Sequence, residues 1–500
     1  MPKMFSRMTY IGLREAVVSK SKRVGIMVPL FSLPGNFGIG DIDSMYQFID
    51  QLDGSGVSII QLLPMNAVSG DETSPYSGIS AFAVNPVYIS LRRLKYLDVE
   101  LHNWDIPERI NYSAVNEFKF SHLRDSYDNF LAKATPLDKK RLRIFCENTA
   151  DWLPDYSLFH ALSHEHKKAF WDWPKEHQNP ADASAWGTEN QNKVGFFTYL
   201  QWICHEQWHG LKNYAASKGI QFMGDLPLYV SKNSADAWSR PEVFKKGVHA
   251  GVPPDIYAED GQDWGNPIYD WKIMAKDGYQ WWKDRVKWLK EFCDLVRIDH
   301  IRGIYSYWAV PDGALPKDVK SWTPGPKAAL IDALKETKME LIGEDLGDIP
   351  PAVDKWMDKI KVPGYKVFLF GWGSYESEKY RFAEEYPKES LACTSTHDSE
   401  SFWEFLEALS EEQIFELGAY LGVQEGEEFT IDDLLKRSIK KLIDSPSRYV
   451  MFPLQDVLGK AIRINTPGSV SEDNWSRVIP VGTQELNSLS EFSSWIKSSS

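Results

Sequence analysis

The sequence contains few cysteines. Its four, Cys146, Cys204, Cys293 and Cys393, lie far apart and form no C-x-x-C motif. Such sparse and distant cysteines argue against a disulfide framework and against a cysteine-ligated metal cluster. We therefore expect a chain that remains reduced, and a cytoplasmic location.

Long apolar segments and an excess of positive charge are also missing. No run approaches the roughly 20 apolar residues of a membrane helix, and residues 1–20 lack the apolar stretch of about 7–15 residues typical of a signal peptide. The formal net charge is −14. Nucleic acids and anionic membranes attract basic patches, so neither is expected as a partner.

What is present is an ordinary globular composition with many aromatic residues. The 500 residues are 43% hydrophobic and 25% charged, which is enough for two to four domains or for one large barrel with insertions. The 20 tryptophans are the unusual feature. They are explained either by a large aromatic core or by a ligand with flat apolar faces, such as a sugar.

Short β-branched runs alternate with helical patterns along the chain. Helical spacing of apolar residues is found, for example, over 42–52, 282–292 and 326–336. The alternation predicts a parallel α/β sheet, and eight strands predict a (β/α)8 TIM barrel, with a doubly wound open sheet as the alternative. The eight strand-like runs are 23–31, 57–64, 220–230, 293–300, 339–347, 365–370, 391–398 and 449–459.

The spacing of these runs predicts insertions. We expect residues 1–90 to form the first part of the barrel and 91–215 an inserted, mainly helical subdomain. Residues 216–485 would complete the barrel and include a lid loop at 251–271, whose Pro, Gly and aromatic residues suggest a cover over a site. The Ser-rich segment 486–500 is expected to be a peripheral tail.

Carboxylates stand at the ends of several predicted strands: Asp225, Asp299, Glu344 and Asp398. The carboxyl ends of barrel strands converge on one mouth, where active sites lie. Arg297 and Asp299 are two residues apart, so on a strand they face the same side. Each residue alone could serve as a structural ion pair or a turn cap. The set together predicts an active site at the barrel mouth.

Paired carboxyl groups suit glycoside chemistry. One carboxylate attacks the anomeric carbon while a protonated acid donates to the leaving oxygen. Arg297 would favour the charged form of Asp299, and Glu344, if desolvated, would keep its proton. A metal site is the competing use of such carboxylates, but the nearby Arg297 and His397 disfavour it, so no metal and no cofactor are expected.

Several blocks of the sequence resemble the 4-α-glucanotransferases, the amylomaltase or disproportionating-enzyme family of the α-amylase superclan. The blocks are RIDHIRG (297–303), GEDLG (343–347), STHDSES (395–401), SPYSGISAFAVNP (74–86), GDLPLYVSKNSADAW (224–238), GVPPDIYAEDGQDWGNPIYDW (251–271) and PLQDVLGKAIRINTPGSVSEDNW (453–475). This family has a (β/α)8 barrel with inserted subdomains, which the resemblance therefore implies here.

The resemblance also implies roles for individual residues. It implies Asp299 as nucleophile, Glu344 as acid/base and Asp398 as a stabiliser that grips the sugar. Tyr257 replaces a Phe common in the family and is expected to stack on a sugar face. The further substrate contacts that it implies are Arg297, His397, Asp225, Ser74, Tyr76, Gln262, Trp264, Asn266 and Asn465.

The resemblance implies transfer of α-1,4-glucan segments between maltooligosaccharides, glycogen or starch-derived dextrins through a covalent glycosyl-aspartate. Two alternatives stay open. An α-glucan hydrolase on the same scaffold would share the first half of the reaction. A catalytically silent glucan-binding protein would be expected to lack at least one of the three carboxylates, and all three are present.

Overall fold

The computed structural model describes residues 22–70, 72–254, 259–347, 349–482 and 485–499. Its centre is a sheet of eight parallel strands in the order β10-β11-β12-β1-β2-β3-β6-β9. Gly343 N donates to the Pro363 carbonyl oxygen (2.9 Å) between β9 and β10, where the two ends of the sheet meet. This is the predicted (β/α)8 barrel, and each predicted run overlaps one strand, with β10 and β11 beginning one residue before their runs. The strands are β1 Arg23–Met27, β2 Ile59–Gln61, β3 Gln221–Leu226, β6 Leu295–Ile298, β9 Glu340–Gly343, β10 Gly364–Val367, β11 Ser390–Cys393 and β12 Tyr449–Pro453.

The barrel strands are buried on both faces, which explains their nearly continuous apolar sequences. Every residue of β12 is buried, and it pairs with β1 from Arg23–Tyr449 to Met27–Pro453. The approach of β1 to β2 is so close that a Cβ at Gly25 would lie 2.5 Å from the Ile59 carbonyl oxygen. A side chain at this position would push the two strands apart.

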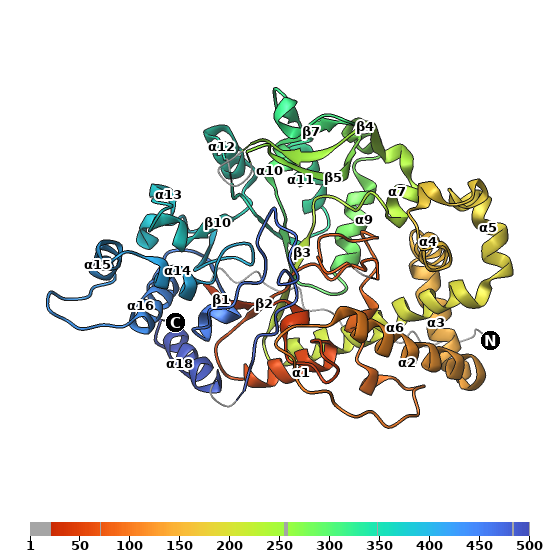
Figure 1. Ribbon diagram of the computed structural model, residues 1–500, viewed down its shortest axis with the longest axis horizontal. Helices are drawn as coiled ribbons and strands as arrows, with labels where there is room; N and C mark the ends of the chain where they lie inside the picture. Colours follow the sequence, from red (N-terminus) through yellow and green to blue (C-terminus); the bar gives the residue numbers. More distant parts are fainter. Residues whose placement is uncertain (1–21, 71, 255–258, 348, 483–484, 500) are drawn as a thin grey trace, which may run out of the picture.

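Helices cover the outside of the barrel (Figure 1). The strongly amphipathic α16 buries Leu435, Ile439 and Leu442 against it, and its N-terminus is capped by Thr430, whose Oγ1 accepts from Asp433 N at 3.1 Å. The helices that cover the barrel or lie beside the second sheet are α1 Ile42–Gln51, α8 Trp271–Ala275, α9 Gln280–Leu289, α10 Arg302–Tyr305, α11 Ala328–Lys335, α12 Pro351–Ile360, α13 Glu378–Arg381, α14 Phe402–Ala408, α15 Glu411–Tyr420, α16 Ile431–Asp444 and α17 Leu454–Val457.

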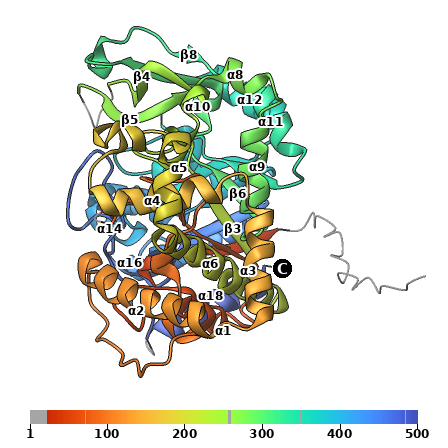
Figure 2. The same ribbon diagram turned by 90° about the vertical axis from the view of Figure 1, so that its right-hand side faces the viewer.

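The segment between β2 and β3 holds the longest helices and lies beside the barrel (Figures 1 and 2). Lys119 of α2 reaches the buried N-cap residue of α1, Asp41, with 2.9 Å between Nζ and Oδ2. Along the described ranges, no helix combines the length and the apolar character needed to cross a bilayer. The helices are α2 Tyr112–Lys133, α3 Pro136–Asn148, α4 Leu153–His166, α5 Pro180–Glu189 and α6 Gln191–Ser217, with the short α7 Ala235–Ser239 after β3.

A second sheet, which the sequence did not lead us to expect, stands over the barrel mouth. It is antiparallel, with the order β5-β4-β7-β8. Residues 251–271 were expected to be a loop, but much of that segment is strand β5. Gly265 and Pro267 hid the strand, because both usually break strands; proline is tolerated here because β5 is an edge strand. The strands are β4 Phe244–Val252, β5 Gln262–Tyr269, β7 Ser306–Pro311 and β8 Thr323–Pro324.

The C-terminal segment also differs from the expected peripheral tail. Glu485–Ser498 is a helix, α18, that buries Leu489, Phe492 and Ile496 along one face. The ring of Phe492 packs edge-on against Phe452 of β12, with 5.4 Å between ring centroids. The serines between these apolar residues masked their helical spacing.

Candidate active site

A cleft of about 1130 Å³ opens at the carboxyl ends of the barrel strands. It brings together most of the residues predicted from the sequence. Asp225 lies just beneath it, in contact with Arg297, and Tyr257 lies outside the described residues. The predicted residues that line the cleft are Ser74, Tyr76, Gln262, Trp264, Asn266, Arg297, Asp299, Glu344, His397, Asp398 and Asn465.

Arg297 is the buried cation of the cleft. The parallel register places it beside Asp225, and its Nη1 lies 2.6 Å from Asp225 Oδ2 and 2.9 Å from Asp299 Oδ1. Its Nη2 lies 3.8 Å from Glu344 Oε2. Burial would lower the pKa of Arg297, but the carboxylates around it raise that pKa well above its usual value. One guanidinium therefore holds three carboxyl groups together.

The backbone fixes the positions of Asp299 and Glu344. Asp299 N donates to the Leu226 carbonyl oxygen (3.1 Å), and Glu344 N donates to that of Ile298 (2.9 Å). His300 adopts a left-handed φ of 46°, and its N–H donates to Glu344 Oε2 at 2.7 Å. The backbone hydrogen bonds of the barrel thus continue past the strand ends, so Asp299 and Glu344 are both attached to a rigid backbone.

Glu344 is held in its protonated form more readily than an ordinary glutamate. Its side chain is only 11% exposed. Burial and the charge of Asp299 raise its pKa to about 7, against the opposing effects of Arg297 and of hydrogen bonds from His300 N and Leu346 N. A carboxyl group with this pKa gains and loses a proton near neutral pH, as general acid/base catalysis requires.

Asp398 has the opposite character. Its partial burial would raise its pKa, but the charge of His397 and hydrogen bonds from His397 and Asn465 outweigh this and lower the pKa to about 2. Asn465 Nδ2 donates to Asp398 Oδ1 at 2.7 Å, and His397 Nε2 lies 3.3 Å from Oδ2. With 44% of its side chain exposed, Asp398 presents a permanent negative charge to the cleft.

Tyr76 links the two halves of the site. Its hydroxyl donates to Asp225 Oδ2 at 2.8 Å and lies 3.0 Å from His397 Nε2. Its ring stacks on that of His397, with 5.6 Å between centroids, and contacts Trp475. Ser74, two residues earlier, supports this turn because its Oγ accepts from Tyr76 N at 3.3 Å.

Strand β5 carries the other side of the cleft. Trp264 packs edge-on against His300, with 5.2 Å between ring centroids, and its Nε1 donates to Gln262 Oε1 at 3.2 Å. Asn266 Nδ2 donates to the Val230 carbonyl oxygen at 2.8 Å. These side chains line the cleft together with Ser74 and Tyr76, and they are held by the edge strand of the second sheet.

Sequence reasoning missed several residues that support the site. Tyr365 of β10 lies beneath Arg297, 5.9 Å from its guanidinium, and accepts a hydrogen bond from Gln61 (3.1 Å). Both belong to apolar runs, where nothing distinguished them from core residues. Trp475 stood out only as one of many tryptophans.

Asp456 was also missed, although it lies near the end of the predicted strand run 449–459 and follows the observed strand β12 by three residues. It is fully buried and accepts from Thr394 Oγ1 (2.6 Å), Ser395 Oγ (2.5 Å) and Phe402 N (2.7 Å). These contacts fix the segment that leads from β11 to Asp398. Its position after a strand end was the signal that could have identified it.

The described residues contain no group of three or more His, Cys, Asp or Glu side chains arranged to hold a metal ion. In the cleft, the space between Asp225, Asp299 and Glu344 is taken by Arg297. The cleft instead combines Glu344, whose pKa is raised to about 7, with Asp398, whose pKa is lowered to about 2, and with the carboxyl group of Asp299. This combination suits proton transfer and attack on an electrophilic carbon.

Comparison with known proteins gives one consistent result. The family model described as 4-alpha-glucanotransferase matches residues 28–482. The chain is 34% identical to the 4-alpha-glucanotransferase of Synechocystis sp., over 90% of this chain and 92% of that protein. It is 35% identical to that of Clostridium butyricum, over 89% and 94%.

A solved structure agrees with these sequence matches. The amylomaltase from Streptococcus agalactiae in complex with acarbose superposes with a TM-score of 0.86 at 27% identity, covering 95% of this chain and 98% of that one. The amylomaltase from Corynebacterium glutamicum, at 20% identity and a TM-score of 0.75, shares the fold.

The geometry predicts that Arg297→Met is strongly destabilising. Removing one partner of a buried ion pair costs about 3–5 kcal/mol, and here two or three carboxyl groups lose their cation. The cost should be smaller at pH 5 than at pH 7, because protonation of Asp225 and Glu344, whose pKa values are already raised, relieves their repulsion. Urea unfolding at the two pH values measures this.

Lys440→Met serves as the matched control, because Lys440 forms an exposed pair with Asp444 (3.0 Å). Its loss should cost less than about 1 kcal/mol. Adding Asp225→Asn to Arg297→Met should restore part of the stability. Equal stability of Arg297→Met and the control at pH 7 would show that the buried cluster does not depend on Arg297.

Proposed function

Since the chain belongs to the family of 4-alpha-glucanotransferases, we propose that this enzyme moves α-1,4-glucan segments by a retaining, two-step mechanism with a covalent glycosyl-Asp299 intermediate. The acceptor is the 4-hydroxyl of another glucan or of glucose. The observation that carries the proposal is that the pKa values of two carboxyl groups in one cleft are shifted in opposite directions. The pKa of Glu344 is raised to about 7, and that of Asp398 is lowered to about 2.

In the first step, an Asp299 oxygen bonds to the anomeric carbon of the donor while the bond from that carbon to the leaving O4 breaks. Glu344 gives its proton to O4, so the leaving chain departs as a neutral alcohol. Arg297, 2.9 Å from Asp299 Oδ1, holds the attacking carboxyl group in position. The buried and fixed position of Glu344 suits it to donate the proton.

In the second step, the roles reverse. The acceptor's 4-hydroxyl gives its proton to Glu344, and its oxygen bonds to the anomeric carbon as the bond to Asp299 breaks. Two displacements at the same carbon retain its α configuration. Every proton and electron pair is supplied by the glucan, Asp299 and Glu344, so the mechanism needs no cofactor.

Asp398 would stabilise the sugar rather than react with it. As a permanently charged carboxylate held by Asn465 and His397, it can accept hydrogen bonds from ring hydroxyls and favour the positive charge that develops at the anomeric carbon. Ser74 and Tyr76 would contact the donor side, with Asp225 and His397 holding Tyr76 in place. Gln262, Trp264 and Asn266 would contact the acceptor side.

The substrate class follows from the same reasoning. Acarbose is bound by the amylomaltase from Streptococcus agalactiae, and the cleft here, at about 1130 Å³, has room for several sugar units. We propose maltooligosaccharides and the outer chains of glycogen or starch-derived dextrins. Trp264 and its neighbours on β5 would favour sugar over water at the intermediate, which separates transfer from hydrolysis.

Purified enzyme incubated with maltotriose tests the proposed function. Transfer should produce glucose together with maltopentaose and longer chains, resolved by length on anion-exchange chromatography. Release of glucose and maltose alone would instead identify an α-glucan hydrolase. Unchanged maltotriose would identify a glucan-binding protein without catalytic activity.

Asp299→Asn tests the nucleophile. The amide cannot form the glycosyl ester, so turnover of maltotriose should fall by about 10⁴-fold or more, while the affinity for maltoheptaose, measured by calorimetry, should change by less than about tenfold. Asp444→Asn, a surface substitution of the same kind, should leave both unchanged. Near wild-type turnover of Asp299→Asn would refute the assignment.

The raised pKa of Glu344 predicts the pH dependence of kcat/KM. The first step needs Glu344 protonated, so the rate should be level below pH 7 and fall about tenfold for each pH unit well above it, since its pKa is about 7. Initial rates with maltotriose between pH 6 and 9 measure this. Glu344→Gln should be slow at every pH, without that decline. A wild-type rate that stays level to pH 9 would assign the proton to another group.

A further inference from the structure

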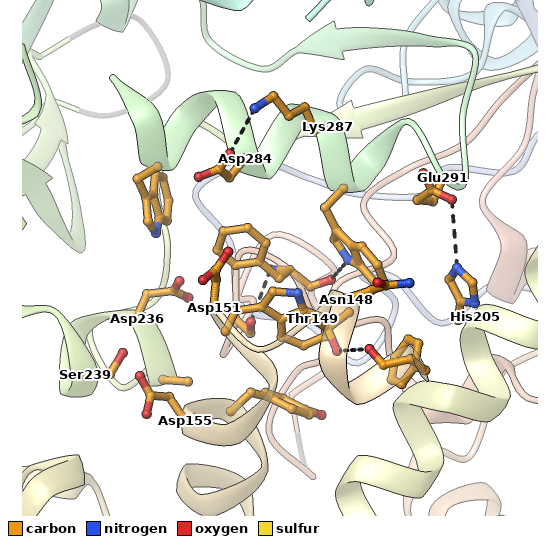
Figure 3. A pocket seen from close by; sticks show the side chains of 18 of the residues that line it. Asn148, Thr149, Asp151, Asp155, His205, Asp236, Ser239, Asp284, Lys287 and Glu291 are labelled. Atoms are coloured by element: carbon orange, nitrogen blue, oxygen red, sulfur yellow. Dashed lines mark hydrogen bonds and ion pairs between the residues drawn. The ribbon is translucent and has the colours of Figure 1, made fainter. Parts of the chain in front are cut away.

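A second large cavity lies outside the active-site cleft. It has a volume of about 1060 Å³ and shares no lining residue with the cleft. Helix α9 forms one wall, and the inserted helices α3, α4 and α6 form the others, as Figure 3 shows with Asp284 and Lys287 on one side and His205 on another. It therefore lies where the inserted segment meets the barrel.

A row of aromatic rings lines this cavity. Trp281 meets Phe82 edge-on (5.8 Å between centroids), Phe82 stacks on Trp152 (5.8 Å), and Trp152 contacts Trp288 (5.2 Å). His205 continues the row by stacking on Trp288 at 5.7 Å. Successive flat, apolar surfaces of this kind suit a chain-like ligand built of repeated units that have flat apolar faces.

Hydrogen bonding fixes the row in place. Trp288 Nε1 donates to the Phe82 carbonyl oxygen at 2.7 Å, which ties α9 to the loop after β2. Phe82 and Trp281 are buried, whereas Trp152 and Trp288 are half-buried and reach the open space. The cavity thus has a buried aromatic floor, and its exposed rim carries Arg141, Asp151, Lys287 and Glu291.

Acidic groups predominate among the charged side chains of the cavity. Six Asp or Glu side chains line it, against three Lys or Arg side chains. Several carboxylates are visible together in Figure 3, where Asp151, Asp155 and Asp236 lie on the same side. This excess disfavours phosphates and other anions, while carboxylates readily accept hydrogen bonds from hydroxyl groups.

An organic cation fits less well than a neutral ligand. The guanidinium of Arg285 already lies over the rings of Trp281 (5.7 Å) and Trp282 (5.1 Å), so a positive charge is in place behind the aromatic floor. Lys287 and Arg141 add positive charge at the rim. A neutral, hydroxyl-rich molecule with apolar ring faces matches both the aromatic row and the carboxylates.

We propose that this cavity is a second glucan-binding site, which holds a distant part of the chain whose end reacts in the cleft. The choice of an α-glucan rests on the proposed function. The loop after β2 joins the two sites: Ser74 and Tyr76 face the cleft, and Ser80 and Phe82 face the cavity. Its middle is fixed by Ala81 N, which donates to Asp236 Oδ2 at 2.8 Å.

Counting bound ligand tests the proposal. In the full-length Asp299→Asn protein, equilibrium dialysis with labelled maltoheptaose gives the number of molecules bound per chain. Adding Trp152→Ala should reduce that number by one, because the half-buried ring at the centre of the row is lost. Adding Trp171→Ala, which removes a tryptophan that is 44% exposed and outside both cavities, should not.

Four further measurements test the interpretation. Asp284→Ala, at the rim, should weaken the second binding event several-fold even if Trp152→Ala fails to fold. In the catalytically active protein, Trp152→Ala should leave maltotriose turnover within about twofold, since Trp152 does not line the cleft, and should raise KM for glycogen about tenfold. Cellohexaose should not occupy the cavity.

An unchanged number of bound maltoheptaose molecules in folded Trp152→Ala, or a second-site affinity unaltered by Asp284→Ala, would overturn the proposal. Equal affinity for cellohexaose would overturn the choice of an α-glucan. Failure of the proposed function would appear separately, as the absence of transfer products from maltotriose in the unmodified enzyme.

Discussion

The whole site depends on one buried cation. Arg297 lies on a barrel strand with three carboxyl groups around it, and neither partner is stable without the other: a buried guanidinium needs compensating charge, and clustered carboxylates need a cation between them. The register of β3 against β6 provides this arrangement, since Asp225 stands directly beside Arg297. The strand register of the barrel thus determines which carboxyl group lies beside the buried guanidinium.

Around this cation, similar carboxyl groups acquire different properties from their surroundings. Glu344 is enclosed and loses hydration, so it retains a proton near neutral pH, whereas Asp398 faces the cleft with His397 and Asn465 as hydrogen-bond partners and stays ionised. The difference comes from burial and from neighbouring donors rather than from residue type. An acid and a permanent anion therefore coexist within one cleft.

Much of this could be predicted from the sequence. All eight barrel strands were identified because buried parallel strands are nearly continuous apolar runs, and Asp299, Glu344 and Asp398 stood out as charged residues at the ends of such runs. Strand β5 escaped because Gly265 and Pro267 interrupt it, and its place depends on pairing with a partner that no local pattern reveals.

The residues behind the site were harder to predict. Tyr365 and Asp456 act through contacts with chain segments distant in sequence, such as Gln61 and Thr394. Helix α18 was hidden by serines, although its three buried apolar side chains follow helical spacing. The burial of a side chain and the identity of its hydrogen-bond partners depend on the tertiary structure. A single sequence therefore reveals them only where a charged residue interrupts an apolar run.

The pairing of β1 with β12 has a consequence for how the chain matures. Arg23 and Tyr449 lie far apart along the chain, yet they are neighbours in the sheet. During synthesis, β1 therefore leaves the ribosome long before its partner and keeps an unsatisfied edge until almost the whole chain has emerged. Contacts so distant in sequence make folding slow. Until then, the exposed edge of β1 can pair with other chains, so its protection from aggregation depends on cellular factors such as chaperones.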